Sequence, residues 1–342
     1  MISFDLTIFM DEAHMKKSLK VLITGGAGYI GSHMVLKLLE AGHQPVIVDA
    51  LLNNMKSLAP ENIIIHQFNL NEKEKLDQLL KSEKIDVVMH FAAFIEVGES
   101  VFHPDKYYKN NFVNTLTLLE TMQKNNIKHF IFSSTAAIFG EPQYLPVDEK
   151  HPKNPMSPYG SAKLMCENIL KDFDTAYGLK SVCLRYFNAA GADPLLRTGY
   201  HLERSSHLIP RVLQAAEKKE IIEVYGRDFD TIDGTGVRDY IHVMDLCDAH
   251  LLAMQYLIQG GDSKVYNLGN GRGFSVQQVI DAAKKITQQE IKIKNTARRE
   301  GDPAILYADS TLIQKELNWK PQYPELDTIL KHSWAWEKKN NN

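Results

Sequence analysis

A glycine-rich turn between a strand pattern and a helix pattern constrains this chain more than any other feature. The segment VLITGGAGYIGSHMVLKLLEAGH, residues 21–43, places Gly25, Gly28 and Gly31 at three-residue steps after an apolar run. In such a turn the first glycine permits a tight bend, the second lets the backbone approach a pyrophosphate, and the third lets the helix pack on the strand. The free N–H groups at the helix start attract phosphate. The segment therefore predicts dinucleotide binding.

An acidic residue at the end of the next apolar run indicates which dinucleotide is bound. Asp49 is the last residue of the run 45–49. There its carboxylate can accept hydrogen bonds from both ribose hydroxyls of an adenosine. The same charge would repel a 2′-phosphate, and no arginine follows closely. We therefore expect NAD as the cofactor and not NADP.

The spacing of apolar runs predicts an α/β fold. Near-continuous apolar runs are typical of strands buried on both faces of a parallel sheet, and here they occur at 19–24, 45–49, 62–68, 87–92, 129–133 and 181–186. Helical periodicity fills the gaps at 30–41, 74–82, 115–125 and 162–177. Alternating units of this kind give a Rossmann-type, doubly wound parallel sheet.

The pattern of predicted strands and helices changes after residue 190. Turn-rich pieces separate shorter helix patterns at 209–219 and 243–258, which favours a smaller mixed α/β lobe at the carboxyl ends of the strands. We expect the dinucleotide domain at 19–190, with contributions from about 235–260, and the substrate lobe at 191–338. Residues 1–18 read as a poorly ordered extension. The first fourteen fit no targeting signal, and Met15 opens a more natural beginning, so an upstream start assignment is an alternative.

The composition excludes several classes of binding partner and location. The net charge of -3 argues against a general nucleic-acid binder. Three cysteines, Cys166, Cys183 and Cys247, lie among apolar neighbours without metal-type spacing, so we expect reduced thiols, no metal site and a cytoplasmic protein. No apolar run approaches the ~20 residues of a membrane span.

Candidate catalytic groups lie in two segments. SPYGSAKLMCE, residues 157–167, places Tyr159 and Lys163 four apart, so that on a helix the phenol and the amine share one face. A nearby ammonium stabilises a phenolate, so the pair could be a base tuned toward neutrality, although simple packing of the two is the alternative reading. The run HFIFSSTAAIFG, residues 129–140, ends in hydroxyl residues, of which we favour Thr135 as the partner of a substrate oxygen.

Several further stretches complete a resemblance that covers about residues 19 to 338. The sequence resembles the extended short-chain dehydrogenase/reductase family through the glycine triplet, the strand-end hydroxyl and the Tyr-x-x-x-Lys pair. The stretches that narrow it are HFAAFIEVGESV, YYKNNFVNT, LRYFNAAGA, DGTGVRDYIHVMDL and RREGDPAILYADS. The resemblance implies an NAD-dependent isomerase that interconverts UDP-glucose and UDP-galactose through a transient 4-keto sugar. It also implies that NAD stays bound through turnover.

The resemblance assigns roles residue by residue. It implies that Tyr159 exchanges the proton of the sugar 4-hydroxyl, that Lys163 stabilises the phenolate and holds the nicotinamide ribose, and that Thr135 bridges the sugar oxygen and the phenol. The implied cofactor contacts are Gly25, Gly28, Tyr29, Ile30, Gly31, Asp49, Asn69, Leu70, Phe91, Ala92, Ala93, Asn111, Ser133, Tyr159, Lys163 and Tyr186. The implied substrate contacts are Thr135, Asn188, His207, Leu208, Tyr225, Arg238, Arg299, Asp302 and Leu306.

The sequence also departs from the pattern of that family. Ile95 stands where many relatives carry a lysine that touches the cofactor, and Asn69 and Leu70 replace an Asp–Ile pair near adenine. Ala50 replaces a common asparagine, so NAD could be held less tightly. In that family the position of Leu306 gates the pocket beside the sugar 2-substituent. Because leucine is of intermediate size there, activity on N-acetylhexosamine substrates is an open alternative.

Three alternatives remain at this stage. Epimerisation of UDP-glucuronate or UDP-arabinose would need only subtle changes of the pocket. A 4,6-dehydratase would carry an acidic pair directly after Thr135, where this chain has Ala136 and Ala137. A cofactor-sensing binding protein usually lacks the tyrosine or the lysine. By resemblance we also expect a homodimer formed through the helical segments 101–126 and 157–177.

Overall fold

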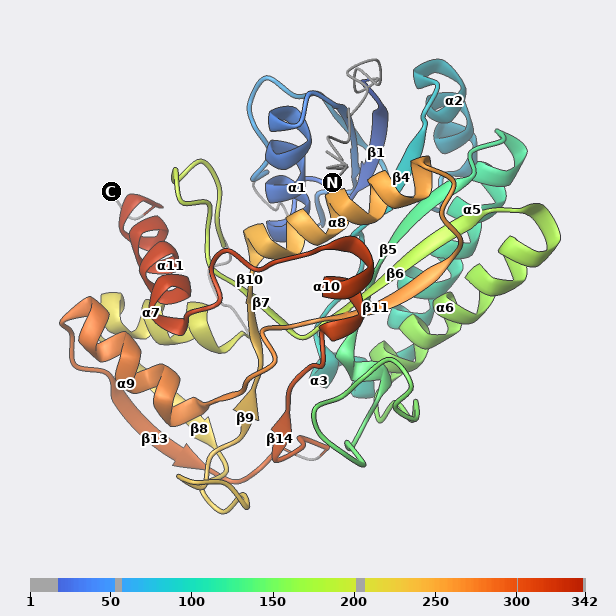
Figure 1. Ribbon diagram of the computed structural model, residues 1–342. Helices are drawn as coiled ribbons and strands as arrows, with labels where there is room; N and C mark the ends of the chain where they lie inside the picture. Colours follow the sequence, from blue (N-terminus) through green and yellow to red (C-terminus); the bar gives the residue numbers. More distant parts are fainter. Residues whose placement is uncertain (1–17, 53–56, 201–206, 300, 341–342) are drawn as a thin grey trace, which may run out of the picture.

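A computed structural model describes residues 18–52, 57–200, 207–299 and 301–340 of the chain. Residues 1–17 of the expected extension lie outside the described residues. Figure 1 shows two regions, one built around a long sheet and one around α7, α9 and α11.

The main sheet has seven strands in the order β11-β6-β5-β4-β1-β2-β3, and every neighbouring pair is parallel. The strands are β1 Lys20–Thr24, β2 Gln44–Asp49, β3 Ile65–Gln67, β4 Val87–His90, β5 His129–Thr135, β6 Lys180–Tyr186 and β11 Lys264–Leu268. The predicted doubly wound sheet is confirmed. Two details differ from the expected sheet. Strand β3 is shorter than the run 62–68, and β11 was not expected in this sheet.

Helices cover both faces of the sheet. On one face α1 (Tyr29–Glu40) packs against α8 (Val243–Ile258), and their apolar side chains share a core cluster with β1, β5 and β6. On the other face a second cluster joins α2 (Lys73–Glu83), α5 (Asn114–Lys124) and α6 (Pro158–Tyr177). The sheet is therefore buried on both sides, as its continuous apolar strands predict.

The second region has its own apolar cluster. Helices α7 (Leu208–Lys218), α9 (Val276–Thr287) and α11 (Leu326–Asn340) pack together with the parallel pair β8 (Ile221–Tyr225) and β13 (Lys292–Thr296). Small sheets connect it to the first region: β7 (Asn188–Ala190) pairs with β10 (Tyr240–His242), and β9 (Val237–Arg238) lies between β12 (Phe274–Ser275) and β14 (Ile305–Leu306).

Short helices complete the fold. They are α3 (Val97–Phe102), α4 (Pro104–Tyr107), the 3-10 turn η3 (Ala136–Ile138) and α10 (Thr311–Leu317). Between α4 and α5 the chain forms a π-helical turn, η2 (Tyr108–Val113), so the helix expected at 115–125 begins earlier than its pattern indicates. Such turns are frequent at functional sites.

A buried ion pair fixes α6 to the sheet. Arg185 on β6 donates from Nε and Nη2 to the two carboxylate oxygens of Glu167 on α6, at 2.9 and 2.6 Å. Ser134 on β5 donates to the same carboxylate at 2.6 Å. Both charged side chains are only 2% exposed. One carboxylate therefore holds a helix and two adjacent strands in a fixed arrangement.

Candidate active site

The glycine loop brings the start of α1 against the end of β1. Gly25 has a φ of +75°, and a Cβ there would lie 2.7 Å from the amide nitrogen of Ala92. A Cβ on Gly31 would lie 2.2 Å from the carbonyl oxygen of Gly25, so the helix can approach the turn only with glycine at this position. Gly28 caps α1 without a side chain. The N–H groups of the first turn are therefore available for a phosphate.

Asp49 lies beside this loop at the end of β2. Its carboxylate accepts hydrogen bonds from the backbone N–H groups of Ala27 at 3.1 Å and Leu51 at 2.9 Å. Burial raises the pKa of Asp49 above its usual value, and the two hydrogen bonds offset part of that effect. The glycine loop, the helix start and this carboxylate together form a cradle whose residues fit the pyrophosphate and ribose of NAD.

The three predicted catalytic residues converge from two elements. Thr135 is the last residue of β5, and its hydroxyl accepts from the backbone N–H of Ala137 at 3.1 Å. Tyr159 and Lys163 lie in the first two turns of α6, which Ser157 caps by accepting from the Gly160 amide. Helix α6 and the turn η3, which follows β5, approach closely here, since a Cβ on Gly160 would be 2.5 Å from the Ala137 carbonyl oxygen.

The charges of this cluster differ from the tuned pair that the sequence suggested. Burial raises the pKa of Tyr159, and the interaction with the Thr135 hydroxyl offsets only part of the rise. Burial also lowers the pKa of Lys163 to about 8. The Lys163 ammonium donates to the backbone carbonyl of Ser133 at 2.8 Å. Within the chain itself burial therefore outweighs the stabilisation of the phenolate, and positive charge from a bound cofactor would lower the phenol pKa.

The second region supplies cations and an aromatic ring. The guanidinium of Arg299 lies 3.8 Å from the centre of the Tyr225 ring. Arg238 forms an ion pair with Asp302, and β14 places Leu306 directly beside Arg238 in register. The first turn of α7 follows His207, whose backbone caps the helix. Guanidinium groups and a helix N-terminus are both suited to a diphosphate.

A single cleft of about 1720 Å³ joins these parts. Every candidate cofactor and substrate residue except Asn111 lines it. On the cofactor side these include Tyr29, Ile30, Asn69, Leu70, Phe91, Ala92, Ala93, Ser133 and Tyr186, and on the substrate side Asn188, His207, Leu208, Tyr225, Arg238, Arg299, Asp302 and Leu306. The structure thus brings together residues that lie up to 281 positions apart, from Gly25 to Leu306.

Asn111 is the exception, because it is not among the residues that line the cleft, and its direct cofactor contact stays a prediction. Its side chain is buried, accepts from the Phe94 amide at 2.8 Å and donates to the Phe94 carbonyl at 2.9 Å. Phe94 itself lines the cleft. Asn111 therefore holds one wall of the cleft from behind, and the π-helical turn that contains it gives a physical reason for its placement.

Several residues of the wall were not predicted from the sequence, and two of them bear on ligand binding. Arg211, in the first turn of α7, and Tyr200 both line the cleft. The signal for Arg211 was a basic residue one turn after His207, where the helix dipole disfavours a cation unless an anion binds nearby. Nothing in the local sequence pattern distinguished Tyr200.

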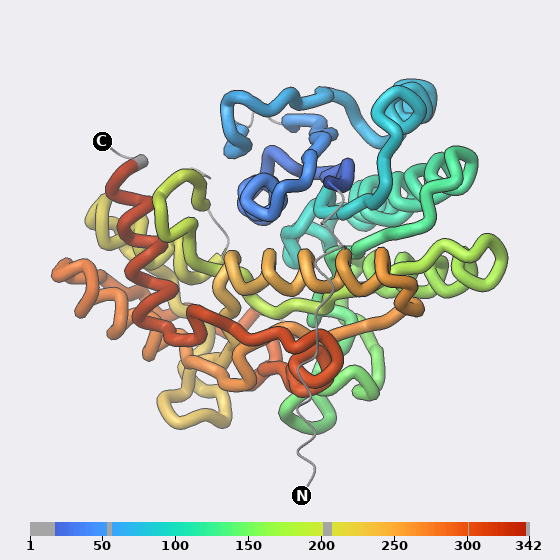
Figure 2. Tube along the Cα trace, turned by 45° about the horizontal axis from the view of Figure 1, so that its top comes forward, coloured from blue at the N-terminus to red at the C-terminus, as the bar shows by residue number. Residues whose placement is uncertain are grey.

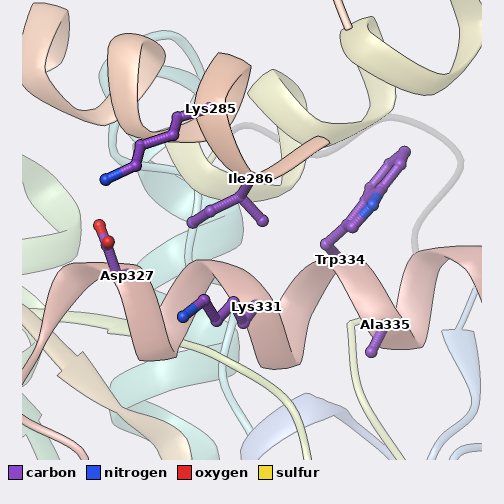
Figure 3. A pocket seen from close by; sticks show the side chains of 6 residues that line it. All are labelled: Lys285, Ile286, Asp327, Lys331, Trp334 and Ala335. Carbon is purple, nitrogen blue, oxygen red and sulfur yellow. The ribbon is translucent and has the colours of Figure 1, made fainter. Parts of the chain in front are cut away.

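A smaller hollow of about 410 Å³ lies between α9 and α11 (Figure 3). Lys285 and Asp327 face it from one end and Trp334 from the other, with Lys331 between. Since a carboxylate and two ammonium groups line the hollow, it does not present a charge of one sign to a ligand. It shares no residue with the cleft.

Across the described ranges, no helix is long and apolar enough to cross a membrane, and no group of three or more His, Cys, Asp or Glu side chains is arranged to hold a metal ion.

The Rossmann-type sheet, the glycine cradle and the Tyr-x-x-x-Lys helix beside a strand-end threonine define a dinucleotide-dependent enzyme of the dehydrogenase/reductase class. A model of the NAD dependent epimerase/dehydratase family matches residues 21–269, and the chain belongs to that family.

Known proteins resemble the chain over nearly its whole length. A UDP-glucose 4-epimerase of Halalkalibacterium halodurans is 46% identical over 321 residues, which cover 94% of this chain and 96% of that protein. A crystal structure of UDP-glucose 4-epimerase from Bifidobacterium longum in complex with NAD+ and UDP is 38% identical, with a TM-score of 0.87 and coverage of 94% and 99%. The UDP-Glc/GlcNAc 4-epimerase of Campylobacter jejuni is 41% identical, with a TM-score of 0.81 and coverage of 94% and 100%.

The buried lysine gives a prediction about pH. Since its pKa is about 8 in the folded protein and near 10.5 when unfolded, the unfolded chain binds more protons between these values. The free energy of unfolding of the wild type, relative to Lys163→Met, should therefore rise as pH rises from 8 to 10. Urea denaturation of both proteins at pH 7.5 and pH 9.5 measures this. A difference that does not change with pH would contradict the assigned pKa.

Proposed function

We propose that this protein is a UDP-glucose 4-epimerase that interconverts UDP-galactose and UDP-glucose with tightly bound NAD. The observation that carries the proposal is the single cleft that joins the glycine cradle, the Tyr159–Lys163–Thr135 cluster and the cationic wall of the second region. The similarity to 4-epimerases over 94% of the chain supports it.

In the proposed reaction the glycine loop and Asp49 would hold NAD, which would supply the acceptor for hydride from the sugar C4 and the donor for its return to the opposite face. Tyr159 takes the proton of the 4-hydroxyl on its phenolate oxygen, holds it while the sugar is a 4-keto compound, and gives it back. Thr135 hydrogen-bonds the same oxygen and orients it toward the phenol. The Lys163 ammonium adds positive charge near the phenolate and favours its formation.

The second region has a different task in this proposal. Arg238 and Arg299 bind the diphosphate, with the N-terminus of α7 as a third donor, and Tyr225 packs near the uracil. By the same resemblance Asp302 lies near the uridine ribose, and it also pairs with Arg238 and so fixes the direction of that guanidinium. The UDP is held firmly and the hexose loosely, which allows the keto sugar to turn over between the two hydride transfers.

The residues after Thr135 argue against the dehydratase alternative. Ala136 and Ala137 line the cleft directly beyond the strand end, and neither can donate the proton that expulsion of a hydroxyl requires. A sensing role without turnover is disfavoured because Tyr159 and Lys163 are both intact. The three cysteines are buried free thiols, which fits the proposal of a cytoplasmic enzyme.

We also propose that the protein is a homodimer. Phe102 on α3, Val113 on η2 and Met165 on α6 are exposed apolar side chains, and Phe102 is 81% exposed. A second copy of the chain would cover this face through the segments 101–126 and 157–177. Sedimentation velocity should give about twice the chain mass of 38.8 kDa, and a monomer at micromolar concentration would contradict the proposal.

Replacing the phenol tests the reaction. Tyr159→Phe keeps the ring but cannot exchange a proton, so kcat for conversion of UDP-galactose to UDP-glucose, without added NAD, should fall by about 10² to 10⁴. Tyr177→Phe, at the far end of the same helix, should remain within twofold of wild type. If Tyr159→Phe retained full activity, the proposed role of the phenol would be wrong.

A second substitution tests the substrate range. Leu306 lines the cleft, and by resemblance it lies beside the sugar 2-substituent. Leu306→Tyr should lower activity on UDP-N-acetylglucosamine at least tenfold more than activity on UDP-glucose, because the larger ring would occupy the space of the acetyl group. Leu306→Met, of similar volume, serves as the control. An unchanged ratio of the two activities in Leu306→Tyr would refute this steric explanation.

A further inference from the structure

The segment 191–200, which we call the strap, connects β7 to the residues before α7 and lies against the first turns of α1. The Tyr29 hydroxyl donates to the Gly191 carbonyl at 2.7 Å, at the beginning of the strap. Ser32 and Thr198 share a hydrogen bond between their hydroxyls at 2.9 Å, near its end. The strap is therefore attached to the helix that begins at the glycine loop.

Tyr200, at the end of the strap, contacts both halves of the cleft. Its ring lies 4.9 Å from that of Tyr29, centre to centre, with the planes 60° apart. It also lies 5.8 Å from the His207 ring, at 81°. Tyr29 is the first residue of α1 and His207 caps α7, so one side chain contacts the starts of both helices that face the cleft.

The C-terminal helix holds the strap from the other side (Figure 2). The Trp336 indole N–H donates to the Tyr200 carbonyl at 2.8 Å, and the Lys339 ammonium donates to the Leu196 carbonyl at 2.7 Å. The indole lies so close to Gly199 that a Cβ there would be 2.3 Å from the ring. The backbone position of Tyr200 is thus fixed by α11.

We propose that Tyr200 is a positioning residue that fixes the start of α7 relative to the glycine loop, and that Trp336 supports it. Tyr200 makes no chemical contribution to hydride or proton transfer. It sets the distance between the dinucleotide-binding helix start and the diphosphate-binding helix start, and so sets the affinity for the UDP moiety. The inference rests on the proposed function, because that function assigns UDP to the start of α7.

Edge-to-face aromatic contacts supply the necessary free energy. Tyr200 makes two such contacts, one with each helix start. The free energy of the two contacts together is large enough to change an affinity about tenfold. Loss of the Trp336 hydrogen bond should have a smaller effect, about threefold, because both rings of the contact remain.

The test is calorimetric titration of the NAD-containing protein, as purified, with UDP. Tyr200→Ala should raise the Kd for UDP about tenfold and the KM for UDP-galactose in parallel, while kcat changes less than threefold. Trp336→Phe should raise the Kd about threefold. Tyr177→Ala, an equally truncated tyrosine remote from the cleft, should bind UDP as the wild type does.

The outcomes separate the two proposals. An unchanged Kd in Tyr200→Ala and Trp336→Phe, even with a lowered melting temperature, would overturn the positioning role. If Tyr200→Ala does not fold, Trp336→Phe decides, because it preserves the aromatic packing on Gly199. Wild-type protein that binds UDP but does not epimerise would overturn the proposed function alone, and wild-type protein that binds no UDP would overturn both.

Discussion

The arrangement of the active site depends on the buried ion pair between Arg185 and Glu167. Glu167 follows Lys163 by four residues and Tyr159 by eight, so all three side chains project from one face of α6. The carboxylate that receives Arg185 and Ser134 therefore sets the position of the phenol relative to Thr135 on β5. A buried pair of this kind often adds little net stability, but the loss of one partner leaves an uncompensated charge. Its value here is that it defines a single geometry.

Electrostatics make the chemistry conditional on the cofactor. The chain buries Tyr159 and Lys163 together, which disfavours both the phenolate and the ammonium. A positively charged ring brought into the cleft would favour the phenolate and so act as the missing charge. The base is then competent when the cofactor is oxidised, which is the state in which proton removal is required.

The sequence allowed prediction of those features that depend on local periodicity. Gly25, Gly28 and Gly31 lie within one turn and one helix, and Tyr159 and Lys163 share a helix face, so spacing alone indicates their roles. Contacts between segments far apart in the chain could not be predicted from the sequence pattern. The place of β11 in the sheet, the bracing of Phe94 by Asn111 and the contact of Tyr200 with two helices each join segments whose proximity is decided by tertiary packing and not by any local pattern.

The π-helical turn η2 has a consequence for how such chains diverge. A π turn contains one residue more than an α turn at the same place, and it lets the Asn111 carbonyl accept from both the Thr115 hydroxyl at 2.6 Å and the Cys166 thiol at 3.3 Å. Removing a single codon in 108–113 would restore ordinary helix but rotate everything before it by about 100°. This stretch should therefore tolerate exchange of side chains far better than any change of length.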